Sequence, residues 1–243
     1  NEHEACVTVL SAEERKERDE ILERAREVED KIKQDLPGWR ERMTAWETEV
    51  RALPQPKWEP VALEFDDTTA GGQKCVSQGD NSYLAQGYAP TQFQPKMWGK
   101  TALTKITAVR LELLPDSNLP RGGPGRSIFG TAALSEFEMR IAPDGTPIAE
   151  WDKWTPIEVA SAIADVNAPE RPLGSQFHKR EKENRITGPI AFAIDGKAET
   201  AWTTDIDPFS RNEMHEAIFT LKTPLEVPAG HMIGFRPAQQ HGG

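Results

Sequence analysis

The sequence predicts a mainly β protein, a jelly roll or related β-sandwich preceded by an antiparallel α-helical hairpin. Helical periodicity ends near residue 53, and about nine short β-type runs follow it. Loops rich in Pro and Gly separate these runs, and the 243-residue chain contains 18 Gly and 19 Pro, more than the usual share. We therefore expect a helical hairpin over residues 1–53 and a β domain over residues 54–243.

The first helix is predicted over residues 11–35, where Ser11 and Glu14 have the spacing of a capping box. Leu36-Pro37-Gly38 ends this helix, and a second is predicted over residues 38–52. Each carries an apolar stripe at spacings of four, three and four residues: Ile21, Ala25, Val28 and Ile32, then Trp39, Met43, Trp46 and Val50. Matching stripes joined by a short break predict an antiparallel hairpin that packs along them.

The β domain is expected to begin after Pro54-Gln55-Pro56, where short runs bounded by turn residues replace the helical pattern. Strands are predicted over residues 59–65, 82–87, 92–97, 106–114, 132–141, 156–162, 191–194, 217–221 and 231–237. One sandwich accommodates these strands. Two smaller sandwiches divided near residues 143–154 remain an alternative.

The charge of the chain excludes some classes of partner. A net charge of −10 argues against non-specific nucleic-acid binding, which needs a basic face, and it disfavours anionic membranes. No apolar stretch approaches the roughly 18 residues of a membrane-spanning helix, and no signal peptide is visible. Because the chain begins at Asn1 rather than Met, we expect a processed or excised piece of a longer protein.

The two cysteines, Cys6 and Cys75, are too few and too far apart in sequence to define a disulfide framework or a metal site. A single bridge that ties the N-terminal segment to the β domain remains open. There is no Cys-x-x-Cys-His sequence, so this chain is not expected to attach a c-type haem itself.

The stretch from Gly188 to Thr204 carries the first candidate site. Asp195-Gly196 is a strong turn dipeptide, because Gly tolerates positive φ and the Asp side chain can bond the backbone two residues on. The carboxylate of Asp195 and the hydroxyl of Thr200 can face each other across this turn, with backbone carbonyls between them. Such an all-oxygen pocket suits calcium, with Asp195, Ala198 and Thr200 as candidate ligands. A hairpin turn without metal, beside a core Trp202, is the alternative.

The second candidate site is the Gly-rich loop over residues 119–127, Leu-Pro-Arg-Gly-Gly-Pro-Gly-Arg-Ser. A strand rather than a helix is expected to follow it, and its prolines remove backbone donors, so it does not match a phosphate-binding loop. An ordered loop crossing between sheets is the simpler interpretation. If the loop binds a ligand, Arg121 and Arg126 suit a carboxylate or sulfate group.

Motifs of catalysis are not apparent. The five histidines have no recognised ligand spacing, and no Gly-x-Ser-x-Gly elbow occurs. A carboxylate pair that meets only in the folded chain stays open. We expect a protein that is not itself an enzyme.

Two resemblances to known protein families extend these expectations. Ala193-x-Asp195-Gly196 followed by Thr200-x-Trp202 resembles the signature of discoidin-type, galactose-binding-like β-sandwich modules. The resemblance implies the sandwich fold and a structural calcium ion in this loop, since many of these modules carry one.

A longer resemblance covers the chain from about residue 8. Its specific blocks are Trp46-Glu47, the Gly-rich loop, and residues 80–91, 106–116, 130–137, 160–167 and 185–189. They are similar to the interdomain region of planctomycete-type multidomain c-type cytochrome proteins, whose haem lies elsewhere. That family continues into one more strand after the segment matching Gln239–Gly243, so the resemblance implies that the last strand is missing or supplied by a separate chain.

The resemblance implies three functions. The first is a non-catalytic carbohydrate-binding module, with candidate ligand-binding residues in loops: Arg121, Arg126, His178, Phe209, Arg211 and Asn212. The second is a structural or docking spacer that orients the other domains of the parent protein. The third is a non-haem part of a multidomain redox or hydrolytic enzyme. A periplasmic, extracellular or cell-surface location is also implied.

Overall fold

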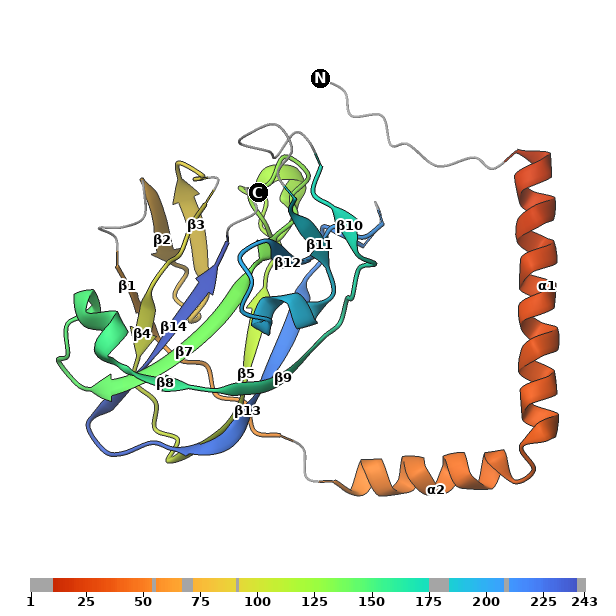
Figure 1. Ribbon diagram of the computed structural model, residues 1–243, viewed down its shortest axis with the longest axis horizontal. Coiled ribbons are helices and arrows are strands. Elements are labelled where there is room, and N and C mark those ends of the chain that lie inside the picture. Colours follow the sequence, from red (N-terminus) through yellow and green to blue (C-terminus); the bar gives the residue numbers. More distant parts are fainter. Residues whose placement is uncertain are drawn as a thin grey trace. The chain divides into compact units, whose positions relative to one another are not determined.

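The computed structural model describes residues 11–53, 56–66, 72–90, 92–174, 184–207 and 210–239 (Figure 1). The chain divides into two compact units, Asn1–Lys57 and Trp58–Gly243. The first contains the two α-helices and the second contains all the described strands. The predicted combination of N-terminal helices and a strand-rich remainder is therefore confirmed.

Both helices begin as the sequence predicts. Helix α1 spans Ala12–Asp35, and its capping box is complete: Ser11 Oγ accepts the Glu14 N–H at 3.2 Å, and Glu14 Oε2 accepts the Ser11 N–H at 2.7 Å. Helix α2 spans Trp39–Ala52 and follows Gly38, whose φ of 74° turns the chain between the helices.

The apolar stripes of the helices do not pack as predicted. No residue of α1 or α2 is buried, and Val28 and Trp46 are 58% and 57% exposed. The helices have local stabilisation instead: the capping box, and i,i+4 ion pairs that include Lys16–Glu20 at 3.9 Å and Arg51–Glu47 at 3.5 Å. The structure thus corrects the expectation that packing along the stripes joins the two helices.

The second unit is built on two main sheets, both antiparallel. The larger has the strand order β1 (Leu63–Phe65), β4 (Met97–Gly99), β14 (His231–Ala238), β7 (Glu136–Pro143) and β8 (Thr155–Ile157). The smaller has the order β5 (Lys105–Leu113), β13 (His215–Glu226) and β9 (Val159–Ala164).

Two further sheets complete the unit. A four-stranded sheet has the order β10 (Arg171–Pro172), β11 (Ile186–Gly188), β12 (Thr200–Thr203) and β6 (Ala133–Leu134), and its β11–β12 pair is parallel. Strands β2 (Gln73–Ser77) and β3 (Tyr83–Gly87) form a hairpin. The Gly-rich loop lies beside β10–β12 at one end of the unit (Figure 1).

The main sheets share one hydrophobic core. The rings of Phe137 on β7 and Phe219 on β13 are stacked, with centroids 3.9 Å apart and planes inclined by 14°. Alternate residues of β7 are buried in this core over most of the strand, as the two-residue period of a strand predicts. Trp202 is also fully buried there, and its Nε1–H donates to the carbonyl of Val166 at 3.0 Å.

A smaller cluster covers the opposite face of the larger sheet. Trp151 and Trp154 lie over Gly234 of β14, where a Cβ atom would come within 2.5 Å of one ring and 2.8 Å of the other. Glycine is therefore required at this position by close approach of the two indoles.

Most predicted strands are present, but the segment 191–194 is not a strand. It lies in the 3₁₀ helix η4, Ile190–Ile194, which begins after Pro189 and buries Ile190 and Ala193. A spacing of three residues between buried positions matches the 3₁₀ period, and an apolar run of this length does not distinguish the two states. Of the predicted segment 92–97, only Met97 belongs to a strand, β4.

Gly234→Ala tests the contact with the two indoles. Because an added methyl group would overlap the rings, we expect a loss of about 1–3 kcal/mol of stability. Thermal unfolding should show a melting temperature lower by roughly 2–4 °C per kcal/mol. Ile163→Ala, at an exposed position of β9, is the control and should leave the melting temperature nearly unchanged. Equal melting of Gly234→Ala and the parent chain would contradict this packing.

Candidate functional site

Three arginines gather around one aromatic ring and one carboxylate; we call Arg121, Arg171 and Arg211, with Phe129 and Asp205, the arginine cluster. The guanidinium carbons of Arg121 and Arg211 lie 5.2 and 5.3 Å from the centroid of the Phe129 ring. Asp205 joins the other side of the cluster, because its carboxylate lies 2.7 Å from Arg171 Nη2 and 3.6 Å from Arg211 Nη1. The cluster thus unites residues from three separate loops and strands.

The Gly-rich loop holds Phe129 in place by folding back on itself. Gly125 donates its N–H to the carbonyl of Gly130 at 2.9 Å, and a Cβ atom on Gly125 would overlap the backbone of Thr131. Ser127 Oγ accepts the N–H groups of Phe129 and Thr131 at 3.1 and 3.0 Å. The predicted ordered loop is confirmed, and its glycines allow two backbone segments to touch.

The backbone of the loop also orients Arg121. This residue lies within the 3₁₀ turn η1, Pro120–Gly122, with φ of 54°, a left-handed conformation that costs a non-glycine residue about 1 kcal/mol. Its side chain is exposed and its guanidinium lies over Phe129. Strained residues are found where the surrounding structure fixes a side chain, as this loop does.

Asn212 connects the arginine cluster to the Gly-rich loop. Its Oδ1 atom is buried, has no hydrogen-bond partner among the described residues, and lies 2.7 and 2.8 Å from where Cβ atoms would stand on Gly123 and Gly130. Of the six predicted ligand-binding residues, the structure therefore brings Arg121, Arg211 and Asn212 together.

The remaining three predicted ligand-binding residues have different outcomes. Arg126 is used inside the fold: its guanidinium donates to the carbonyls of Gly87 at 2.5 Å and Tyr88 at 3.3 Å, which ties the β2–β3 hairpin to the Gly-rich loop. Burial lowers the pKa of Arg126. His178 and Phe209 lie outside the described residues.

Sequence reasoning missed Phe129, Arg171 and Asp205. Phe129 stands two residues beyond the quoted Gly-rich segment, so an aromatic in such a loop was an available clue. Arg171 and Asp205 have no motif of their own, and only the pairing of β10, β11 and β12 brings them close.

The Asp195 turn has the arrangement that the sequence predicts. Thr200 Oγ1 lies 3.0 and 2.9 Å from the two carboxylate oxygens of Asp195, and 3.2 Å from the carbonyl oxygen of Lys197. Asp195 Oδ1 also accepts the N–H of Lys197 at 2.9 Å, and Gly196 has a φ of 77°. Ala198 is exposed in the same turn. The facing carboxylate and hydroxyl are therefore confirmed.

A second carboxylate, Glu136 at the start of β7, lies beside this turn. Burial raises the pKa of Glu136 from 4.5 to about 7, aided by the negative charge of Asp195 and opposed by the backbone N–H groups of Gly196 and Lys197. Its Oε1 atom is buried and has no hydrogen-bond partner in the described part of the chain. Because Glu136 and Asp195 are far apart in sequence, no spacing rule could have paired them.

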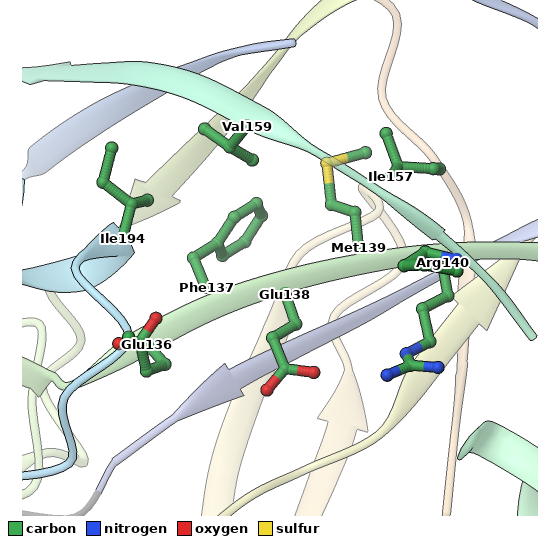
Figure 2. Close-up of a pocket in the computed structure, with 10 residues that line it drawn as sticks. Glu136, Phe137, Glu138, Met139, Arg140, Ile157, Val159 and Ile194 are labelled. Atoms are coloured by element: carbon green, nitrogen blue, oxygen red, sulfur yellow. The ribbon is translucent and has the colours of Figure 1, made fainter. Parts of the chain in front are cut away.

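Glu136 and Gly196 also line a shallow pocket of about 220 Å³ along one edge of β7 (Figure 2). Phe137, Met139 and Ile157 form its apolar side. The side chains of Glu136 and Glu138 lie on the other side of the strand (Figure 2). The strand β7 therefore separates the apolar side of the pocket from the two carboxylates.

The residues around the turn fit a hard cation. Asp195, Glu136 and Thr200 offer carboxylate and hydroxyl oxygens, and Glu136 Oε1 is a buried acceptor without a partner among the residues that the structure describes. Within the described ranges, no three His, Cys, Asp or Glu side chains come together as a metal-binding group. A cation here would depend on hydroxyl and carbonyl oxygens as well.

A pair formed by the buried His215 and the carboxylate of Asp165 was also not predicted. His215 Nδ1 lies 2.8 Å from Asp165 Oδ2, and Asp165 Oδ1 accepts the N–H of Glu216 at 3.1 Å. These bonds fasten the end of β9 to the start of β13, which is a structural role.

Comparisons with protein-family models, with curated proteins and with solved structures gave no match to this chain. No described helix is both long enough and apolar enough to cross a membrane. Cys75 lies in β2 and Cys6 lies outside the described residues, so the question of a bridge between them stays open.

Glu136→Gln tests the pKa of Glu136. The native state holds the proton up to about pH 7 and the unfolded chain only to about 4.5, so ionisation of Glu136 lowers stability progressively between these values. In a chelating buffer the variant should therefore melt higher than the parent chain at pH 8, by roughly 2–4 °C for about 1 kcal/mol. At pH 4 the two should melt alike.

Glu64→Gln, at an exposed position of β1, is the control for loss of a carboxylate. An advantage of Glu136→Gln that is equally large at pH 4 and pH 8 would mean that the raised pKa is not its cause.

Proposed function

We propose that this chain is a non-catalytic carbohydrate-binding module with a discoidin-like β-sandwich. The observation that carries the proposal is the arginine cluster, in which Arg121 and Arg211 both contact the Phe129 ring on an ordered loop. Aromatic rings bind the apolar faces of sugars, and guanidinium groups donate several hydrogen bonds in a fixed geometry to their oxygens. A binding site on a rigid loop loses little entropy when a ligand arrives.

The fold supports the same proposal. Two antiparallel sheets that share one core around Phe137 and Phe219 are the basis of a sandwich, whose loops gather at the ends. The Gly-rich loop and β10–β12 lie together at one such end. With this function we propose a periplasmic, extracellular or cell-surface location, where polysaccharides are met, and a parent protein of the multidomain cytochrome type.

The chemistry of the cluster favours binding over catalysis. Its carboxylate, Asp205, is engaged in ion pairs with Arg171 and Arg211. Hydrolysis of a glycosidic bond needs one carboxyl group that holds a proton and a second that acts as base or nucleophile. The arginine cluster provides guanidinium donors instead.

We further propose a structural calcium ion at the Asp195 turn, held by Asp195, Thr200 and Glu136 with carbonyl oxygens that include that of Ala198. The observation that supports it is the buried Oε1 of Glu136, which has no partner within the described ranges and whose carboxyl group lies near the Asp195 carboxylate. When bound, the ion would offset the repulsion between the two carboxylates and hold the turn before β12.

A docking role is the second candidate, and a specific observation favours it. The apolar stripes of α1 and α2 are exposed, including Val28 and Trp46. Isolated helices of this length gain most of their stability from a partner surface. A neighbouring domain of a parent protein would supply one, so binding to a sugar and docking to a domain can belong to different units of the chain.

The carbohydrate proposal predicts binding on a glycan array that depends on the cluster. Arg211→Ala and Phe129→Leu should weaken binding to any positive glycan at least tenfold, which corresponds to about 1.4 kcal/mol. Lys105→Ala, an exposed cation on β5 outside the cluster, should bind as the parent chain does. A blank array with a folded sample would shift the proposal to the docking role.

The calcium proposal predicts a melting temperature that depends on the cation. Calcium at about 100 times its Kd would stabilise the chain by about 2.7 kcal/mol, and a chelator would remove this gain. Asp195→Ala should abolish the response, while Asp152→Ala, at an exposed position, should keep it. The same melting curve for the parent chain with and without chelator would refute the site.

A further inference from the structure

We infer that the sugar bound by the arginine cluster carries an acidic group, a sulfate ester or a carboxylate. This inference rests on the proposed carbohydrate function and narrows it to one class of ligand. Both groups present several acceptor oxygens around one negative charge, and that shared chemistry is what the cluster recognises.

The charge balance of the cluster is the first argument. Among the described residues, the three guanidinium groups of the cluster meet one carboxylate, that of Asp205, and their summed charge stays positive when Asp207, whose carbonyl accepts the Arg211 N–H, is included. The chain as a whole carries −10. Three neutral hydrogen-bond donors could bind an uncharged sugar without the repulsion between like charges. A positive cluster on an acidic protein therefore indicates that the ligand itself carries negative charge.

The arrangement of the arginines is the second argument. Asp205 holds Arg171 and Arg211 in position, and the side chain of Arg211 is only 16% exposed. Its Nε atom is buried and has no partner among the described residues. The guanidinium of Arg211 is thus held in position before any ligand arrives, which reduces the entropy lost on binding.

Arg121 supplies the charge that the fold itself does not neutralise. No carboxylate among the described residues forms an ion pair with it, and its side chain is exposed beside Phe129. The left-handed backbone at this position directs the guanidinium to the ring of Phe129, which Arg211 also contacts. Two guanidiniums on one ring without a second carboxylate leave room for an anion supplied by the ligand.

The net charge of the chain affects how binding of an acidic polymer depends on salt concentration. Repulsion between the acidic protein and an acidic polymer acts at long range and is screened beyond about 8 Å at physiological ionic strength. Contacts between guanidinium and an acidic group are shorter than this and are screened less. Binding should therefore be present near 0.15 M salt and weaken at higher salt.

Two matched pairs of polymers test the inference. The first is carrageenan and its chemically desulfated form, and the second is polygalacturonate and its methyl ester; each pair keeps the sugar and removes the charge. The Kd of the purified chain is measured for all four at 0.15 and 0.5 M NaCl. Arg121→Gln and Arg171→Gln are the test variants, and Lys105→Gln is the control for loss of an exposed cation.

We expect at least one acidic polymer to bind tenfold or more tightly than its neutral partner, and to bind more weakly at the higher salt. Arg121→Gln should weaken that binding at least fivefold without lowering the melting temperature, and Lys105→Gln should not. A Kd difference within the carrageenan pair would identify a sulfate ester as the acidic group, and a difference within the polygalacturonate pair would identify a carboxylate.

Three results would overturn the inference. Equal binding of the neutral and acidic partners, unchanged in Arg121→Gln, would leave the carbohydrate function standing and remove the acidic group. Acidic binding weakened as much by Lys105→Gln as by Arg121→Gln would show general attraction to cations. Absence of binding to these polymers and to a broad glycan array would overturn the carbohydrate function as well.

Discussion

The stack of Phe137 on Phe219 is the contact on which the second unit depends. Phe137 belongs to the five-stranded sheet and Phe219 to the three-stranded sheet, so their rings join the two main layers directly. The buried side chains of β14 and β12 then fill the space around these rings. Because this packed core holds β6, β10 and β12 in place, the loops next to these strands start from fixed positions. The side chains of the arginine cluster are positioned by those loops and strands.

Much of this architecture could be predicted from sequence where a local rule applies. The capping box, the Asp195-Gly196 turn and the long strands β5, β13 and β14 each rest on short-range chemistry, and the structure confirms them. Strands β10, β11 and β12 have two to four residues, which is too short for a period to show. The prediction of a strand over residues 191–194 was wrong for a similar reason, since a short apolar run is compatible with more than one backbone conformation.

The residues of the candidate sites also divide into those that a local sequence pattern indicates and those that only the fold brings together. Arg121, Arg211 and Asn212 could be proposed because they lie in loops rich in Gly or next to the turn, whereas Glu136, Arg171 and Asp205 become relevant only through strand pairing. The helices show the opposite limit: their apolar stripes are evident in the sequence, yet these side chains are exposed in the structure. Pattern identifies an apolar face, and only the fold identifies its neighbour.

Strand β12 gives the two candidate sites a common base. All four of its residues, Thr200–Thr203, are buried; Thr200 faces Asp195 at one end, and at the other Thr203 Oγ1 accepts the N–H of Asp205 at 3.0 Å. The Asp195 turn and the arginine cluster thus lie next to opposite ends of one short, fully buried strand. Because all residues between these ends are buried, a displacement of one end of β12 would have to be accommodated by the side chains packed around the strand.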